Sequence, residues 1–100
     1  PGGSRIITMV LQVLVNVIDH KMNIAEATAA ARIHHQWLPD KLFVEGGLSP
    51  DTLAILRQRG HIVTPSRAAG SMQSVMRVPR GAGFLGASDS RSLGALTAGY

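Results

Sequence analysis

The chain opens with two adjacent glycines, Gly2 and Gly3, immediately before its most apolar segment. Because glycine has no side chain, its backbone can approach a ligand closely. The first N–H groups of a helix have no partner within the helix, and the positive end of the helix dipole lies beside them. Such amides can bind a carboxylate or stabilise an oxyanion that develops during acyl transfer. The alternative interpretation is a flexible terminus in which Ser4 caps the helix.

The four histidines could suggest a metal site, but their spacing does not favour one. His34 and His35 are adjacent in a segment patterned as a strand, so their side chains point to opposite faces. The chain has no cysteine, and no helix carries two histidines four residues apart with a glutamate between them. We therefore expect histidines that make ordinary hydrogen bonds, and no metal site.

A serine nucleophile is poorly supported as well. Ser74 lies within an expected strand and lacks the Gly-x-Ser-x-Gly elbow that exposes a catalytic serine. Residues 88–91, Ser-Asp-Ser-Arg, form a polar cluster that is more typical of a turn or cap than of a charge relay. The absence of cysteine excludes disulfides and thiol nucleophiles. No complete catalytic set emerges from these residues alone.

The net charge of +4 does not predict a nucleic-acid partner. A surface that follows a phosphate backbone needs clustered positive charge, often with aromatic rings on which bases stack. The ten basic residues are instead scattered along the chain, and only four residues are aromatic. A mildly basic, solvated surface is the interpretation that we adopt.

The composition predicts apolar faces that the chain cannot cover by itself. Its 100 residues make one small domain or a piece of a larger one. Hydrophobic residues are 45% of the chain and charged residues only 16%, against a usual charged share of about 25%. This composition also excludes a disordered chain and a fibrous one.

The most apolar segment, residues 6–18, predicts a core helix. Its polar interruptions, Thr8, Gln12 and Asn16, recur every four residues and so form one narrow stripe on a helix. The run is too short to cross a bilayer, which takes about 20 apolar residues, and it lacks the flanks of a signal peptide. A helix that is apolar on nearly every other side needs neighbours on two sides.

The rest of the chain predicts a mixture of helices and strands. Asn23 and Glu26 have the spacing of a capping box at the start of a helix over 23–31. Ser49 followed by Pro50 starts another helix that ends at Gly60, with Leu53 and Leu56 facing inward and Ile55 as a third candidate for that face. Alternating or short apolar runs predict strands over 32–37, 41–45 and 61–63, then a loop over 65–70 and a hairpin of 71–78 with 84–87. The order is helix-helix-strand-strand-helix-strand-hairpin, an α+β layout.

Several strings of the sequence together resemble one family, the gamma-glutamyltransferases or glutathione hydrolases. They follow the family's order and cover the whole chain: Pro1-Gly-Gly-Ser-Arg-Ile-Ile7, Asn16-Val-Ile-Asp19, Met22-Asn-Ile-Ala-Glu-Ala27, Arg32-Ile-His-His-Gln-Trp37, Leu48-Ser-Pro-Asp-Thr-Leu53, Gly86-Ala-Ser-Asp89 and Ala98-Gly-Tyr100. One such string would be weak evidence, whereas this many in order are highly specific.

The resemblance implies a fold and a reaction. The fold is the N-terminal-nucleophile hydrolase architecture, an αββα sandwich, of which this chain would be a part. The nucleophile of the family is a threonine that self-cleavage frees at the start of the small subunit. It attacks a gamma-glutamyl amide such as glutathione, and water or an amino acid resolves the acyl-enzyme. The family uses no metal or organic cofactor and is periplasmic or secreted.

The resemblance implies that residues 1–100 of this chain are an incomplete domain, namely the C-terminal portion of the small subunit. Gly2 and Gly3 match the paired glycines whose backbone N–H groups line the oxyanion hole, and Gly3 also contacts substrate. The nucleophile and the groups that hold the glutamyl moiety would lie upstream of Pro1. The partners implied are the N-terminal part of the small subunit, the large subunit and a gamma-glutamyl substrate, with no nucleic acid and no membrane span. The alternative is a truncated or degenerate remnant that acts at most as a binding module.

The sequence departs from the family at a few positions. Met9 and Met72 stand where the family usually has threonine, and Ala31 and Ser90 replace prolines. Lys21 stands where a glycine normally ends the first helix. A lysine in a left-handed cap costs roughly 1 kcal/mol relative to glycine. None of these changes affects Gly2 or Gly3.

We predict that the isolated 100-residue chain is catalytically inert. Its threonines are internal, so none has the free α-amine that this mechanism uses as a base: Thr8, Thr28, Thr52, Thr64 and Thr97. Assay of the chain with glutathione or a gamma-glutamyl nitroanilide should give no product above the blank. Measurable turnover would contradict the assignment of the nucleophile to another segment.

Overall fold

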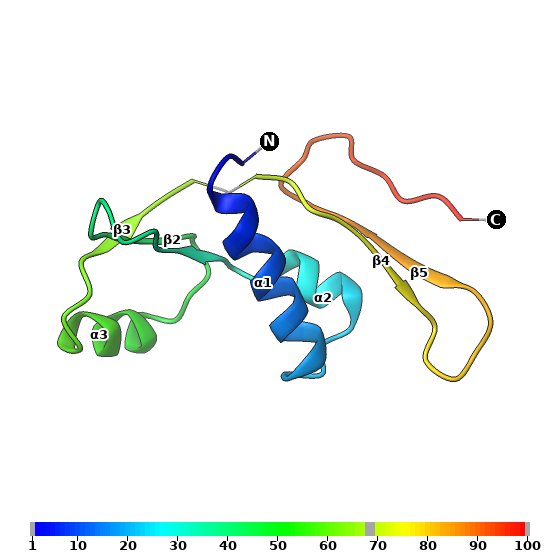
Figure 1. The fold of residues 1–100 in the computed structure, drawn as a ribbon, viewed down its shortest axis with the longest axis horizontal. Coiled ribbons are helices and arrows are strands. Elements are labelled where there is room, and N and C mark those ends of the chain that lie inside the picture. The colour runs from blue at the N-terminus through cyan, green and yellow to red at the C-terminus, as the bar shows by residue number, and fades with distance from the viewer. Residues whose placement is uncertain (1, 68–69, 100) are drawn as a thin grey trace.

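The computed structural model describes residues 2–67 and 70–99. Pro1, residues 68–69 of the expected loop and Tyr100 of the last family string lie outside the described residues. Two small sheets stand at opposite ends of an elongated molecule of 47 × 26 × 22 Å, and two helices lie between them (Figure 1). The expected order of helices and strands is confirmed.

Helix α1, Arg5–Ile18, covers the segment expected to be a core helix. Met9 and Val13 are buried on the face that packs against α2 (Ile24–Ala29) and β1 (Ile33–His34). The rest of the helix surface carries uncovered apolar side chains: Ile6, Ile7, Val10, Leu11, Leu14 and Ile18. Among the described residues, α1 has neighbours on one side only, although its sequence predicts two.

Helix α2 begins with the expected capping box. The Asn23 side chain accepts from the Glu26 amide at 2.8 Å, and the Glu26 carboxylate accepts from the Asn23 amide at 3.2 Å. The helix ends at Ala29 rather than at residue 31, because Ala30 already has an extended backbone (ψ 143°). Local propensity favoured a longer helix in this alanine-rich stretch, but the chain must turn here to enter the first sheet.

The first sheet has the order β1-β2-β3, with β2 at Leu42–Val44 and β3 at Val63–Pro65. Strand β1 pairs antiparallel with β2, and β3 pairs parallel with β2. The strand expected over 32–37 is reduced to two residues, and Trp37 has a left-handed backbone (φ 71°) that does not fit an extended strand. The strand expected over 61–63 begins two residues later.

Helix α3, Pro50–Gln58, connects the two parallel strands and starts as expected. The Ser49 hydroxyl accepts from the Thr52 amide at 3.2 Å. Leu53 and Leu56 are half-buried, and no residue of the helix is fully buried. Ile55, the third candidate for the inward face, is 50% exposed. The inward face was therefore identified correctly for Leu53 and Leu56 only, and the described residues do not complete its burial.

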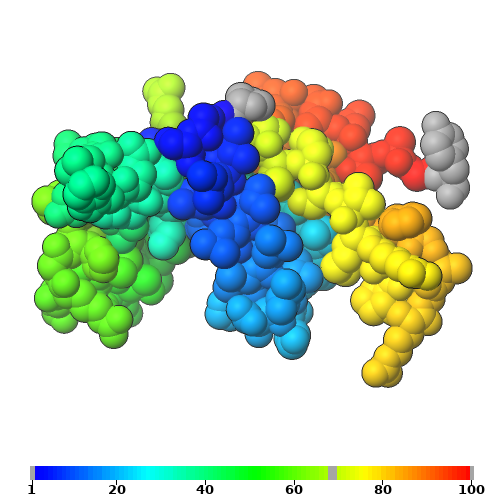
Figure 2. Space-filling model, in the orientation of Figure 1, coloured from blue at the N-terminus to red at the C-terminus, as the bar shows by residue number. Residues whose placement is uncertain are grey.

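The second sheet is the expected hairpin, formed by β4 (Gln73–Arg77) and β5 (Phe84–Ser88) in antiparallel pairing. Its turn projects from one end of the molecule (Figure 2). The small apolar core lies between this hairpin and the two central helices, and its buried members are Val13, Ile24, Ala27 and Ala87. Val75 and Phe84 point away from that core and are about three-quarters exposed.

The end of α1 has the strained geometry that its sequence predicts. Lys21 adopts φ 57°, in the left-handed region. Its ammonium donates to the carbonyl of Ile18 at 2.6 Å, and the Met22 amide donates to the carbonyl of Asn16 at 3.0 Å. The lysine thus satisfies a free helix-end carbonyl but retains the steric cost of a Cβ atom at positive φ.

We predict that Lys21→Gly stabilises the protein. Glycine relieves a strain of roughly 1 kcal/mol at this φ, which should raise the melting temperature of the full-length protein. Lys21→Ala is the matched control, because it loses the same ammonium contact but keeps the strain. An alanine variant as stable as the glycine variant would show that the left-handed backbone carries no penalty here.

Candidate functional site

The two N-terminal glycines form the turn that starts α1. The Gly2 and Gly3 carbonyls accept from the amides of Arg5 and Ile6 at 3.0 and 3.2 Å. Gly3 is exposed and has φ 54°, a conformation that favours glycine. Among the described residues, neither the Gly2 amide nor the Gly3 amide donates to any acceptor. The turn therefore offers two N–H groups at the positive end of a 14-residue helix.

Ser4 does not cap the helix, which corrects the alternative interpretation of this segment. Its backbone is helical and its side chain makes no capping bond. The Ser4 hydroxyl donates instead to the Oε1 atom of Gln36 at 2.8 Å. This side-chain hydrogen bond therefore links the diglycine turn to the segment that follows β1.

A row of polar side chains continues from this bond into the molecule. The His34 ring is buried, with Nε2 3.0 Å from Gln36 Oε1 and Nδ1 2.8 Å from the Thr8 hydroxyl. Because Gln36 donates through Nε2 to the carbonyl of Leu38, its Oε1 must accept from His34. We therefore assign His34 a proton at Nε2. The Thr8 hydroxyl, which contacts Nδ1, also donates to the carbonyl of Arg5 at 3.0 Å.

The polar stripe of α1 fixes the first strand. Gln12 donates to the carbonyl of Ile33 at 2.8 Å and accepts from the Ile33 amide at 2.9 Å. This side chain thus pairs with the free edge of β1 as a neighbouring strand would. Thr8 and Gln12, which the sequence placed on one stripe, both face β1 and the residues beside it.

The buried side chains that sequence reasoning missed form an ionic network of Arg32, Glu45, Asp89 and Arg91. Asp89 is fully buried, and its carboxylate contacts Arg32 Nη2 at 2.8 Å and Arg91 Nη1 at 3.0 Å. Arg91 also reaches the Glu45 carboxylate at 2.5–3.1 Å through Nε and Nη2. The Glu45 carboxylate accepts in turn from the Arg32 amide at 3.0 Å.

The network also supplies the missing end cap of α2. Arg91 donates to the carbonyls of Thr28, Ala29 and Ala30 at 3.2, 3.5 and 2.8 Å. These carbonyls lack partners within the helix, and a cation beside them also complements the negative end of the helix dipole. Residues 88–91 include the local turn that the sequence suggested, in which the Arg91 amide donates to Asp89 Oδ1 at 3.0 Å. They also make a long-range connection that the sequence did not predict.

The pKa of Asp89 is lowered to about 2 by its hydrogen bonds. Burial by itself raises this pKa, because it disfavours the charged form. The amides of Arg91 and Met72 and the side chains of Arg91 and Arg32 donate to the carboxylate and outweigh that effect. Burial lowers the pKa of Arg91, but its contacts with Glu45 and Asp89 outweigh this effect and hold that pKa above its usual value.

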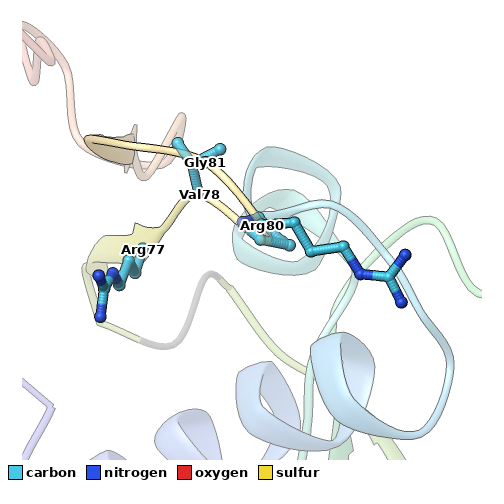
Figure 3. Close-up of a pocket in the computed structure, with 5 residues that line it drawn as sticks. Arg77, Val78, Arg80 and Gly81 are labelled. Atoms are coloured by element: carbon cyan, nitrogen blue, oxygen red, sulfur yellow. The ribbon is translucent and has the colours of Figure 1, made fainter.

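Several other features that could carry chemistry lie in the part of the chain that the structure describes. The hollow at the hairpin turn is lined by Arg77 and Arg80, whose side chains point in different directions (Figure 3). In residues 2–67 and 70–99, no three histidine, aspartate or glutamate side chains come together as metal ligands would. Ser74 accepts a hydrogen bond from Thr28 at 2.9 Å. No described helix has the length and apolar character needed to cross a membrane.

The fold belongs to a known class of hydrolases. The chain superposes on an acivicin-inhibited gamma-glutamyltranspeptidase with a TM-score of 0.87 and 44% identity, over 93% of this chain and 51% of the other. The enzyme of Pseudomonas nitroreducens gives a TM-score of 0.85 and 35% identity, over 100% and 53%. The described residues are thus an α+β part of the N-terminal-nucleophile hydrolase fold.

The sequence comparisons identify the family. The model of the gamma-glutamyltranspeptidase family matches residues 1–99, so the chain belongs to that family. It is 60% identical to the glutathione hydrolase proenzyme of Escherichia coli over its whole length. The alignment covers only 17% of that proenzyme, so the chain spans about one sixth of this curated relative and half of the solved chains.

We predict that Asp89→Asn removes a pH-dependent part of the stability. The folded pKa of Asp89 is below its unfolded value of 3.8, so its contribution is present above about pH 4 and is lost as the pH falls toward 2. A shift of this size corresponds to roughly 2 kcal/mol. The difference in unfolding free energy between wild type and variant should shrink by that amount over this interval.

The control for this experiment is Asp40→Asn. Asp40 pairs with His35 at 3.0 Å, but its side chain is 81% exposed. Near neutral pH, Asp89→Asn should destabilise the full-length protein by about 3–5 kcal/mol, because two buried guanidinium groups lose a charged partner. Asp40→Asn should cost less than about 1 kcal/mol. Equal effects of the two variants would contradict the structural role of the network.

Proposed function

We propose that this chain is the C-terminal portion of the small subunit of an enzyme that transfers gamma-glutamyl groups and hydrolyses glutathione. In this proposal, the backbone N–H groups of Gly2 and Gly3 form the oxyanion hole. The observation that carries it is the diglycine turn, in which both amides lack an acceptor among the described residues, at the start of a long helix. Such donors stabilise the transition state more than the ground state, because the negative charge develops only there.

The reaction takes place in two acyl-transfer steps. A threonine at the N-terminus of the small subunit, outside this chain, attacks the gamma-glutamyl carbonyl and displaces the amine of the leaving group. The carbonyl oxygen becomes an oxyanion in the tetrahedral intermediate, and the Gly2 and Gly3 amides donate to it. Water or an amino acid then attacks the acyl-enzyme and releases the threonine, again through an oxyanion at the same position.

The surface of α1 supports the proposal that other segments complete the domain. Its uncovered side chains include Ile7, Leu11 and Ile18, which are 75%, 56% and 59% exposed. Full burial of one such side chain is worth roughly 1.5–3 kcal/mol. The upstream part of the small subunit and the large subunit are the partners that we propose, and family membership supports a periplasmic or secreted location.

The test of this proposal is Gly3→Ala in the full-length protein that contains this chain. A side chain at φ 54° strains the turn that presents the two amides, although a Cβ atom there would contact nothing within 4 Å. We expect kcat for a gamma-glutamyl nitroanilide to fall about 10–100-fold with little change in KM, since loss of one such donor costs about 10²–10³-fold.

Gly60→Ala provides the matched control. Gly60 follows α3 and has φ 95°, and a Cβ atom at this position would likewise meet nothing within 4 Å. Its substitution carries a similar backbone strain, remote from the diglycine turn, and should leave kcat unchanged. If Gly3→Ala reduced kcat no more than Gly60→Ala, the oxyanion role would be wrong and a non-catalytic binding module would be the better interpretation.

A further inference from the structure

The Met9 side chain lies against the diglycine turn. Met9 lies one turn into α1 and is only 3% exposed. Helical side chains lean toward the N-terminus, and methionine is long and flexible enough to reach the turn before its own. A Cβ atom built on Gly2 would lie 2.9 Å from Met9 Cε and 3.2 Å from Cγ1 of Ile6. The Met9 methyl group therefore packs directly against the Gly2 backbone. This corrects the expectation that the departures from the family, Met9 among them, leave Gly2 unaffected.

The other side of the Met9 side chain rests on the buried ionic network. Its sulfur atom accepts from Arg32 Nη1 at 3.8 Å, a weak but oriented contact. Arg32 is itself held by Asp89, at 2.8 Å from Nη2, and by the carbonyl of Thr28, also at 2.8 Å. Arg32 and Asp89 are 3% and 0% exposed, so this support is enclosed and close-packed.

We propose that Met9 is a positioning residue that holds the Gly2 backbone, and with it the two amides of the turn, in place against the buried Arg32–Asp89 pair. This inference rests on the proposed function of those amides. The turn has few other anchors: the Gly2 and Gly3 carbonyls bond to α1, and Ser4 bonds to Gln36. Loss of the Met9 side chain leaves a cavity into which the turn can shift, and a shift of about 1 Å can reduce catalysis on the order of 10²-fold.

The experiment compares three variants of the full-length protein. Met9→Ala removes the contact and should lower kcat about 10–100-fold, with KM within about twofold, because the lost geometry matters only once the oxyanion forms. Met9→Leu keeps most of the volume without the sulfur and should retain kcat within about threefold. Val13→Ala is the control, since Val13 is buried on the same helix within the apolar core and should affect stability alone.

A stability measurement separates this inference from the proposed function. An added methyl group at Gly2 collides with Met9, so Gly2→Ala should lower the melting temperature less when Met9→Ala is also present. If Gly3→Ala leaves kcat unchanged while this coupling is observed, the oxyanion role fails but the contact stands. If Gly3→Ala lowers kcat whereas Met9→Ala matches Val13→Ala, the positioning role of Met9 is overturned. Absence of the coupling would also overturn it.

Discussion

The buried ionic network of Arg32, Glu45, Asp89 and Arg91 is the interaction on which the described structure depends. Arg32 precedes β1, Glu45 follows β2, and Asp89 and Arg91 follow β5, so the network joins both sheets. Arg91 of the network also donates to the backbone carbonyls at the C-terminal end of α2. A chain with so small an apolar core has little else to hold its two ends together. Buried charges persist only when partners surround them. Here Asp89 accepts from Arg32, Arg91 and the Met72 amide, and Glu45 accepts from Arg91 and the Arg32 amide.

The network lies next to the turn proposed as catalytic. From Asp89 the contacts run through the Arg32 guanidinium and the Met9 side chain to the backbone of Gly2. A second route runs from Thr8 through His34 and Gln36 to Ser4. Both series of contacts support the diglycine turn, while its two amides have no acceptor among the described residues. Rigid support with free donors is the arrangement that electrostatic stabilisation of an oxyanion requires.

The exposed apolar surface of the structure follows from the high share of apolar residues in the chain. Apolar side chains on α1, on α3 and on the outer face of the hairpin remain uncovered, and Ile7, Ile55 and Phe84 illustrate the three places. Exposed apolar area of this extent marks a surface that meets another polypeptide. The chain spans half of the solved relatives, which agrees with a structure whose layers are complete on one side only.

Local signals in the sequence determined the elements, the family and the diglycine turn. The Asn23–Glu26 box and the Ser49 cap were predictable, because each depends on residues a few positions apart. The left-handed Lys21 was predictable only from the family resemblance, in which a glycine ends this helix. Tertiary structure alone decided the shortness of β1, the early end of α2 and the ionic network. Asp89 lies 57 positions from Arg32 in the chain, and no local pattern states which distant charge will meet it. Long-range pairing depends on how the elements pack, which only the folded backbone specifies.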